Sequence, residues 1–138
     1  MRIHPGIIAQ AAATSAAMMP GRFFLGVGTG ENLTEHIFGD RWPTHDIREA
    51  MLEEAVAIIR MLWQGDSLTY CGEYYMVKNV RLYTLPDQLP PFFMAASGPR
   101  AAEAAGRLAD GLITTAAETD ILKGFEGGGG WANRPMVN

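Results

Sequence analysis

Cysteine is almost absent from this sequence: Cys71 is the only one in 138 residues, so no intrachain disulfide is possible. Long apolar runs are also absent, since none approaches the roughly 20 residues that span a bilayer. The N-terminus lacks the charged, apolar and cleavage-site order of a signal peptide. A lone thiol and no export signal fit a reducing compartment, so we expect a soluble, cytoplasmic protein.

Basic patches are lacking as well. The 11 Lys and Arg residues are scattered along a chain with a net charge of −4. No basic stripe indicates contact with nucleic acid or an anionic membrane, and we expect neither partner. An acidic balance still permits an anionic ligand, because backbone amides at a turn can bind one locally.

Metal and nucleotide motifs are missing too. His4, His36 and His45 show no metal-ligand spacing, and the chain has no Cys and His cluster, so we expect no metal site. The glycine-rich segment GVGTGE at Gly26–Glu31 does not have the G-x-G-x-x-G spacing of a dinucleotide-binding turn. It also lacks the Gly-Lys-Ser/Thr of a P-loop. The common nucleotide motifs are therefore poor fits.

The chain does contain alternating strand and helix signals. Apolar residues make up 48% and charged residues 19%, a composition that folds as one domain. Short apolar runs without polar alternation are typical of strands covered on both faces, as in a parallel sheet with right-handed crossovers. The predicted elements are a helix over 5–18, a strand over 23–27, a helix over 46–63, a hairpin over 67–77, a strand over 92–96, a helix over 97–108 and a strand over 112–115.

The ends of two segments carry further predictions. Asp46 can cap the second helix, and Glu49 three residues later forms a pair like a capping box. Four consecutive glycines begin at Gly127, and the residues after them show no periodicity. Residues 127–138 are therefore expected to be a disordered tail.

Three strand ends are candidates for ligand binding, because ligands of parallel α/β folds lie outside the carboxyl ends of the strands. Glycines of Gly26–Gly30 let backbone amides approach a ligand, or they form a plain turn. Glu31 could contact that ligand, or it could simply be an acid in the first turn of a helix, where the helix dipole favours a negative charge. The small residues of Ala95–Gly98 leave room for a flat ring, or serve tight helix packing. Thr115 could bind substrate or cap the chain locally.

Several segments in order resemble the luciferase-like superfamily, and most closely its branch dependent on the deazaflavin coenzyme F420, including the glucose-6-phosphate dehydrogenase type. The resemblance covers about residues 3–126. It implies an α/β fold that is part of an eight-stranded β/α (TIM) barrel. We expect about three parallel strands with flanking helices and an inserted hairpin, so that residues 1–126 form a central fragment of the barrel. The segments that carry the resemblance are His4-Pro5 before AQAAAT, then PGRFFLGVGTGENL, HIFGDRWP, MLEEAVAIIRMLWQG, GEYY, RLYTLPD and MAASGPRAAEAAGRLADGLI.

The resemblance also implies roles for residues. Glu31 matches a catalytic carboxylate that faces the N1 edge of the ring, as proton donor or electrostatic stabiliser. Thr115 matches a position that binds substrate phosphate. Glu118 stands where the sugar-phosphate enzymes have Lys, so an alcohol or another reduced carbon compound is the expected substrate rather than glucose 6-phosphate. The residues matched to cofactor contacts are Thr29, Gly30, Glu31, Thr34 (usually Asn in the family), Ala95, Ala96, Ser97 and Gly98.

The function implied is hydride transfer between a small organic substrate and coenzyme F420, in a parent enzyme expected to be a homodimer. Two alternatives remain open. One is a fragment of an FMN-dependent monooxygenase of the same superfamily. The other is an inactive truncated product, because the family's catalytic histidine and neighbouring tryptophan belong to barrel units expected before residue 1. We expect an isolated partial barrel to expose apolar strand edges.

Overall fold

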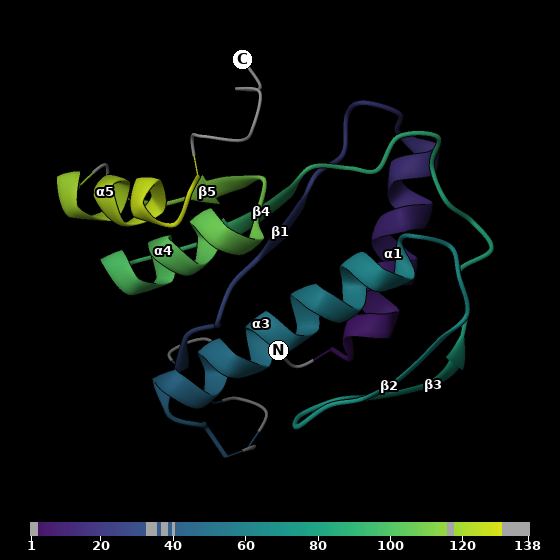
Figure 1. Cartoon of the computed structure of the whole chain (residues 1–138), viewed down its shortest axis with the longest axis horizontal. Coiled ribbons are helices and arrows are strands. Elements are labelled where there is room, and N and C mark those ends of the chain that lie inside the picture. Colours follow the sequence, from purple (N-terminus) through teal and green to yellow (C-terminus); the bar gives the residue numbers. More distant parts are fainter. Residues whose placement is uncertain (1–2, 33–35, 37–38, 40, 116–117, 131–138) are drawn as a thin grey trace.

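A computed structural model describes residues 3–32, 36, 39, 41–115 and 118–130 (Figure 1). The chain forms an α/β fold, part of a TIM barrel, with a parallel sheet and a separate two-stranded hairpin. The helices are α1 (Pro5–Met18), α3 (His45–Leu62), α4 (Pro99–Leu108) and α5 (Thr119–Gly127), and the strands are β1 (Leu25–Val27), β2 (Leu68–Cys71), β3 (Met76–Val80), β4 (Phe92–Ala95) and β5 (Gly111–Ile113).

The parallel sheet has the order β1-β4-β5. Val27 is paired with Met94, and Ala95 with Ile113, so the three strands end nearly level. The N–H of Ala96 donates to the carbonyl of Ile113 at 3.0 Å and extends the ladder by one residue. The turns that follow the strands therefore lie along one edge of the sheet, as the sequence predicted.

Only one face of this sheet is covered in the described part of the chain. Phe92 and Met94 are 0% and 2% exposed and pack against the helices, with the Trp63 ring at the end of α3 lying 6.0 Å from Phe92. Residues of the opposite face are open, with Phe24 at 56% and Ile113 at 39% exposure. The prediction of strands covered on both faces is therefore wrong for these residues, because an apolar run does not show what lies beyond each face.

The hairpin β2–β3 lies beside α3, away from α4 and α5 (Figure 1). Glu54 on α3 attaches it, because its carboxylate accepts hydrogen bonds from the backbone N–H groups of Glu73, Tyr74 and Tyr75. Tyr74 and Tyr75 thus belong to the turn between β2 and β3. A side chain at Gly72 would displace the Glu54 carboxylate, so glycine there lets the carboxylate approach the turn closely.

Helix α3 begins differently from the prediction. Thr44 occupies the N-cap position without a side-chain cap bond, and Asp46 lies in the first turn. Glu49 does not complete a capping box; its carboxylate accepts a hydrogen bond from Arg100 of α4 at 3.2 Å. The ion pair with a neighbouring helix displaces the local interaction that the sequence spacing suggested.

Helix α5 was absent from the sequence prediction. It packs on α4 backbone to backbone: a side chain at Gly124 would collide with the carbonyl of Pro99, and one at Gly106 with that of Phe125. The glycine run contributes to this contact, since a side chain at Gly128 would collide with the carbonyl of Glu103. Gly127 ends α5, and the N–H of Gly130 donates to the carbonyl of Phe125 at 2.9 Å. Residues 131–138 lie outside the described part, and the division at residue 126 stays a prediction.

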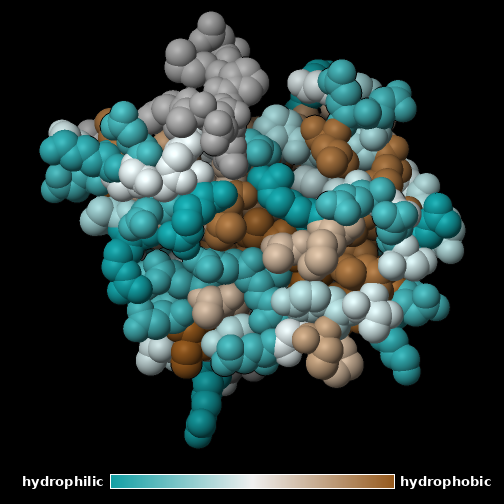
Figure 2. All heavy atoms as spheres, viewed as in Figure 1, coloured by the Kyte–Doolittle hydropathy of each residue, from teal (hydrophilic) through white to brown (hydrophobic). Residues whose placement is uncertain are grey.

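Apolar atoms reach the surface in the middle of the view and over α1, among mostly hydrophilic residues (Figure 2). Two apolar residues of α1, Ile7 and Met18, are 59% and 76% exposed. Within the described residues, none of the helices combines the length and apolar character that crossing a membrane requires.

Candidate functional site

The turn after β1 carries the first group of predicted residues. Gly30 has φ 77°, a left-handed conformation in which a side chain would be strained. A Cβ atom at Gly28 would lie only 3.3 Å from the side chain of Ala95. The glycines therefore serve two purposes: they allow the turn, and they bring the first and second strand ends into contact. Glu31 follows immediately and is exposed.

Arg48, in the first turn of α3, holds this β1 turn. Its Nη1 atom donates to the carbonyl oxygens of Thr29 at 3.2 Å and Gly30 at 3.0 Å, and its Nε atom donates to that of Pro43 at 3.2 Å. The guanidinium also lies over the Trp42 ring, 4.5 Å from its centroid. The turn is thus bound to α3 by a cation.

Sequence reasoning missed Arg48, although one signal was available. A cation in the first turn of a helix opposes the helix dipole, which favours acids there. Such a residue calls for another partner, and here the partners are backbone carbonyls 18 and 19 residues earlier in the chain.

The second strand end comprises Ala95–Gly98. Ala95 and Ser97 are exposed, whereas the side chain of Ala96 is buried beneath them. Gly98 is the N-cap residue of α4, and its carbonyl accepts the N–H of Ala102 at 3.0 Å. The small exposed residues leave the start of α4 accessible from the same edge of the sheet as the Gly30 turn.

The first turn of α3 also reaches this second end. Arg100 of α4 donates to Asp46 at 3.3 Å and to Glu49 at 3.2 Å. His45 lies 3.7 Å from Glu49, so three potential metal ligands are close together. The guanidinium of Arg100 already satisfies both carboxylates, which accounts for the cluster as an ion-pair network. The absence of a metal stays a prediction.

The third strand end contributes Thr115, which is exposed two residues beyond β5. Glu118, the N-cap residue of α5, is exposed as well. Thr34 lies outside the described residues. The structure therefore brings Thr29–Glu31, Ala95–Gly98 and Thr115 to the carboxyl ends of three adjacent parallel strands, the position in which barrels bind ligands.

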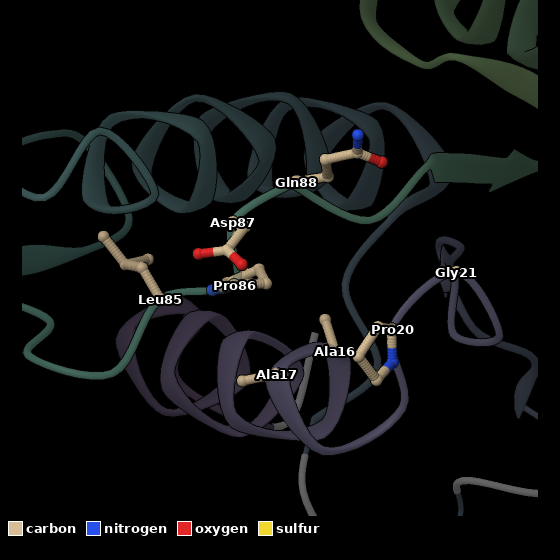
Figure 3. A pocket seen from close by; sticks show the side chains of 8 residues that line it. All are labelled: Ala16, Ala17, Pro20, Gly21, Leu85, Pro86, Asp87 and Gln88. Atoms are coloured by element: carbon tan, nitrogen blue, oxygen red, sulfur yellow. The ribbon is translucent and has the colours of Figure 1, made fainter.

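A separate hollow of about 400 Å³ lies at the other end of the strands. Figure 3 shows its lining, from Ala16 and Pro20 at the end of α1 to Leu85 and Asp87 of the segment before β4. These residues precede β1 and β4, so the hollow does not adjoin the predicted site. The active sites of β/α barrels lie at the carboxyl ends of the strands, on the side away from this hollow.

Comparison with known proteins gives a consistent result. A family model described as luciferase-like monooxygenase matches residues 1–125. An F420-dependent glucose-6-phosphate dehydrogenase of Microbacterium testaceum (strain StLB037) is 50% identical over 121 residues, which cover 88% of this chain and 36% of that protein. An F420-dependent hydroxymycolic acid dehydrogenase of Mycobacterium tuberculosis (strain ATCC 25618 / H37Rv) is 41% identical over 136 residues, covering 96% and 38%.

A solved structure shares the arrangement. An F420-dependent secondary alcohol dehydrogenase in complex with an F420-acetone adduct superposes with a TM-score of 0.89 and 37% sequence identity. The match covers 98% of this chain and 43% of that one. The chain thus spans well under half the length of the proteins it resembles.

Proposed function

Because the chain belongs to the luciferase-like monooxygenase family, we propose that it forms part of an oxidoreductase that transfers a hydride between a small organic substrate and coenzyme F420. The observation that carries the proposal is the edge of the sheet where Thr29–Glu31, Ala95–Gly98 and Thr115 follow three level strands. Two relatives and a solved structure of similar fold are F420-dependent dehydrogenases.

The residues at this edge fit a planar ring. Gly28 and Ala95 place no side chain larger than a methyl group at the ends of β1 and β4, and a Cβ atom added at Gly28 would lie 3.3 Å from that of Ala95. Gly98 has open space where a Cβ atom would lie. A flat, side-chain-poor surface lets backbone amides approach a ring closely. Thr29, Gly30, Ala95, Ala96, Ser97 and Gly98 are the residues that would hold the deazaflavin, and Thr34 is proposed on the resemblance alone.

Glu31 is the proposed catalytic residue. When bound, the deazaflavin supplies the hydride chemistry, as cofactors do in redox enzymes. The carboxylate of Glu31 adjoins the turn that contacts the ring, and it would hold a proton or a negative charge beside the N1 edge. A positioned carboxylic acid contributes about 10²–10⁴-fold in rate as a general acid or base.

The substrate is proposed to be an alcohol. Thr115 offers a hydroxyl group at the third strand end, while the nearby N-cap residue Glu118 adds an exposed negative charge. A carboxylate there repels a phosphate group, which disfavours a sugar phosphate. The relatives that act on a hydroxymycolic acid and a secondary alcohol are compatible with this choice. A homodimeric parent enzyme and a cytoplasmic location complete the proposal.

Titration of the 138-residue chain with F420 and, separately, with FMN tests the cofactor. Saturable quenching of F420 fluorescence, with FMN binding at least about tenfold weaker, supports the proposal, since tenfold corresponds to about 1.4 kcal/mol. Tighter binding of FMN would favour a monooxygenase. Binding of neither cofactor would contradict a cofactor site in this chain.

A matched pair of variants tests the carboxylate. In a protein that turns over with F420, Glu31→Gln should lower kcat by about 10²-fold or more while cofactor affinity changes little. The control is Glu126→Gln, which removes an exposed carboxylate near the C-terminus of α5, away from the strand ends, and should leave kcat unchanged. Equal rates for the two variants would remove Glu31 from the mechanism.

A further inference from the structure

The contact between Arg48 and the β1 turn has an unusual geometry. One nitrogen atom, Nη1, donates to two successive carbonyl oxygens, those of Thr29 and Gly30. The Nε atom of the same guanidinium donates to Pro43, which lies just before α3. Both peptide groups that flank Gly30 are therefore turned toward a single point on α3.

Peptide planarity determines the consequence. In a trans peptide the C=O and N–H groups point in opposite directions, and the described chain has no cis bonds. Since the carbonyls of Thr29 and Gly30 point toward Arg48, the N–H groups of Gly30 and Glu31 point away from it. The left-handed φ of 77° at Gly30 allows two successive carbonyls to face the same side.

We propose that Arg48 is a positioning residue for the ligand site: it orients the two peptide groups around Gly30 so that the Gly30 N–H donates to an acceptor atom of the ligand and Glu31 leaves the turn beside it. The ligand class is a planar heterocycle that carries carbonyl oxygens or ring nitrogens. Its identification as a deazaflavin rests on the proposed function, whereas the orientation rests on the hydrogen bonds alone.

The contact suits arginine and not lysine. Arg48 makes three hydrogen bonds from a fixed planar fork while lying over the Trp42 ring. Lysine has a compact ammonium on a flexible stem and cannot reproduce this fork, although it keeps the charge. A simple electrostatic tie between α3 and the loop would accept either residue, so the Arg48→Lys variant separates the two roles.

Two measurements on the 138-residue chain test the proposal. The three-bond coupling between the amide and α protons of Gly30 reports its φ angle, and F420 fluorescence reports affinity. Arg48→Lys and Arg48→Met should each shift the coupling toward an averaged value and weaken F420 binding by about tenfold, the effect of losing the hydrogen bond from the Gly30 N–H to the ligand. Arg107→Met removes an exposed ion pair between α4 and Glu53 of α3, the helix that carries Arg48. It should change neither the coupling nor the affinity.

The outcomes separate the two proposals. A Gly30 coupling that stays at its original value in Arg48→Lys overturns the positioning role, even if thermal stability falls. A changed coupling and weaker binding at nearly unchanged stability support it. If the unsubstituted chain does not quench F420 fluorescence, the proposed function fails for this chain, and the Gly30 coupling alone then decides the role of Arg48.

Discussion

The guanidinium of Arg60 lies 3.1 Å from the carboxylate of Asp110 and joins α3 to the start of β5. The second carboxylate oxygen of Asp110 accepts the backbone N–H of Phe92 at 2.9 Å. Arg60 also donates to the carbonyl of Leu108 at 2.8 Å. A single acid thus connects the first residue of β4, the turn before β5 and the helix that covers both.

Removal of Asp110 should therefore lower the free energy of unfolding more than removal of a surface acid does. Asp110→Ala leaves the N–H of Phe92 and the Arg60 guanidinium without this acceptor. The free energy of unfolding should fall by about 1–3 kcal/mol, measured by urea denaturation. Glu103→Gln, which weakens an exposed pair with Arg107, should change it by less than about 1 kcal/mol. Equal losses of unfolding free energy in the two variants would show that Asp110 stabilises the fold no more than a surface acid does.

Glu54 provides a second stability test, confined to the hairpin. Glu54→Gln replaces a charged acceptor of three backbone N–H groups, and the turn should be destabilised by about 2 kcal/mol. Amide hydrogen exchange of Tyr74 and Tyr75 should accelerate, while exchange in α4 stays slow. The neighbouring Glu53→Gln affects only a surface pair and should leave the hairpin amides unchanged. Uniform acceleration throughout the chain would contradict a local role.

Tyr75 makes stability depend on alkaline pH. Burial raises the pKa of its phenol above the ordinary value of 10.0, and the Glu54 carboxylate adds to the effect. A raised pKa in the folded state means that the contribution to stability is complete below about pH 10 and is lost as pH rises through the folded pKa. Thermal unfolding across this range should show the loss in the original chain.

The Tyr75→Phe variant removes that titration. Among the described residues the Tyr75 hydroxyl is buried without a hydrogen-bond partner, so its removal should be neutral or slightly stabilising near pH 7. Tyr83→Phe, at a ring that is 88% exposed, is the control and should retain the alkaline loss. An unchanged pH profile in Tyr75→Phe would assign the loss to another group.

Gly30 tests the conformational requirement of the β1 turn. Gly30→Ala forces a side chain into a left-handed conformation and should destabilise by about 1 kcal/mol or more. Gly127→Ala changes a glycine at the end of α5 that has open space and no positive φ, and it should be neutral or slightly stabilising. Thermal denaturation of both variants compares them directly. A neutral Gly30→Ala would show that the turn tolerates other conformations.

The open face of the sheet predicts self-association of the isolated chain. Phe24, just before β1, and Ile113, at the end of β5, are 56% and 39% exposed on this face. Unpaired strand edges also promote association. Sedimentation velocity should show concentration-dependent oligomers that Ile113→Lys reduces. Met76→Lys, at a residue that is 65% exposed on the hairpin, should not reduce them. A monomer at all concentrations would contradict the prediction.

Local signals predicted most of the fold. The bounds of α1 agree with the structure because Pro5 suits a first helical position and a proline and glycine follow its end. Helix α5 was missed because it is short and contains Gly124, which lowers helix propensity. Its stability comes from backbone contact with α4, and no pattern within nine residues shows such a contact.

The candidate site divides in the same way. The strand ends were predicted because apolar runs and glycines mark them in the sequence. Arg48 was not, since its partners Thr29 and Gly30 are distant in the chain and are backbone atoms, which have no sequence signature. The assigned roles of Glu31, Ala95–Gly98 and Thr115 stay predictions for the experiments above.

The lack of a Cβ atom at Gly28, where one would lie 3.3 Å from the side chain of Ala95, has an evolutionary consequence. A side chain at position 28 would press on Ala95, and a larger residue at position 95 needs the space that glycine leaves open. A residue larger than alanine at position 95 should therefore be tolerated only while position 28 is glycine. In a library that varies both, nearly every functional member with a residue larger than alanine at 95 should retain glycine at 28.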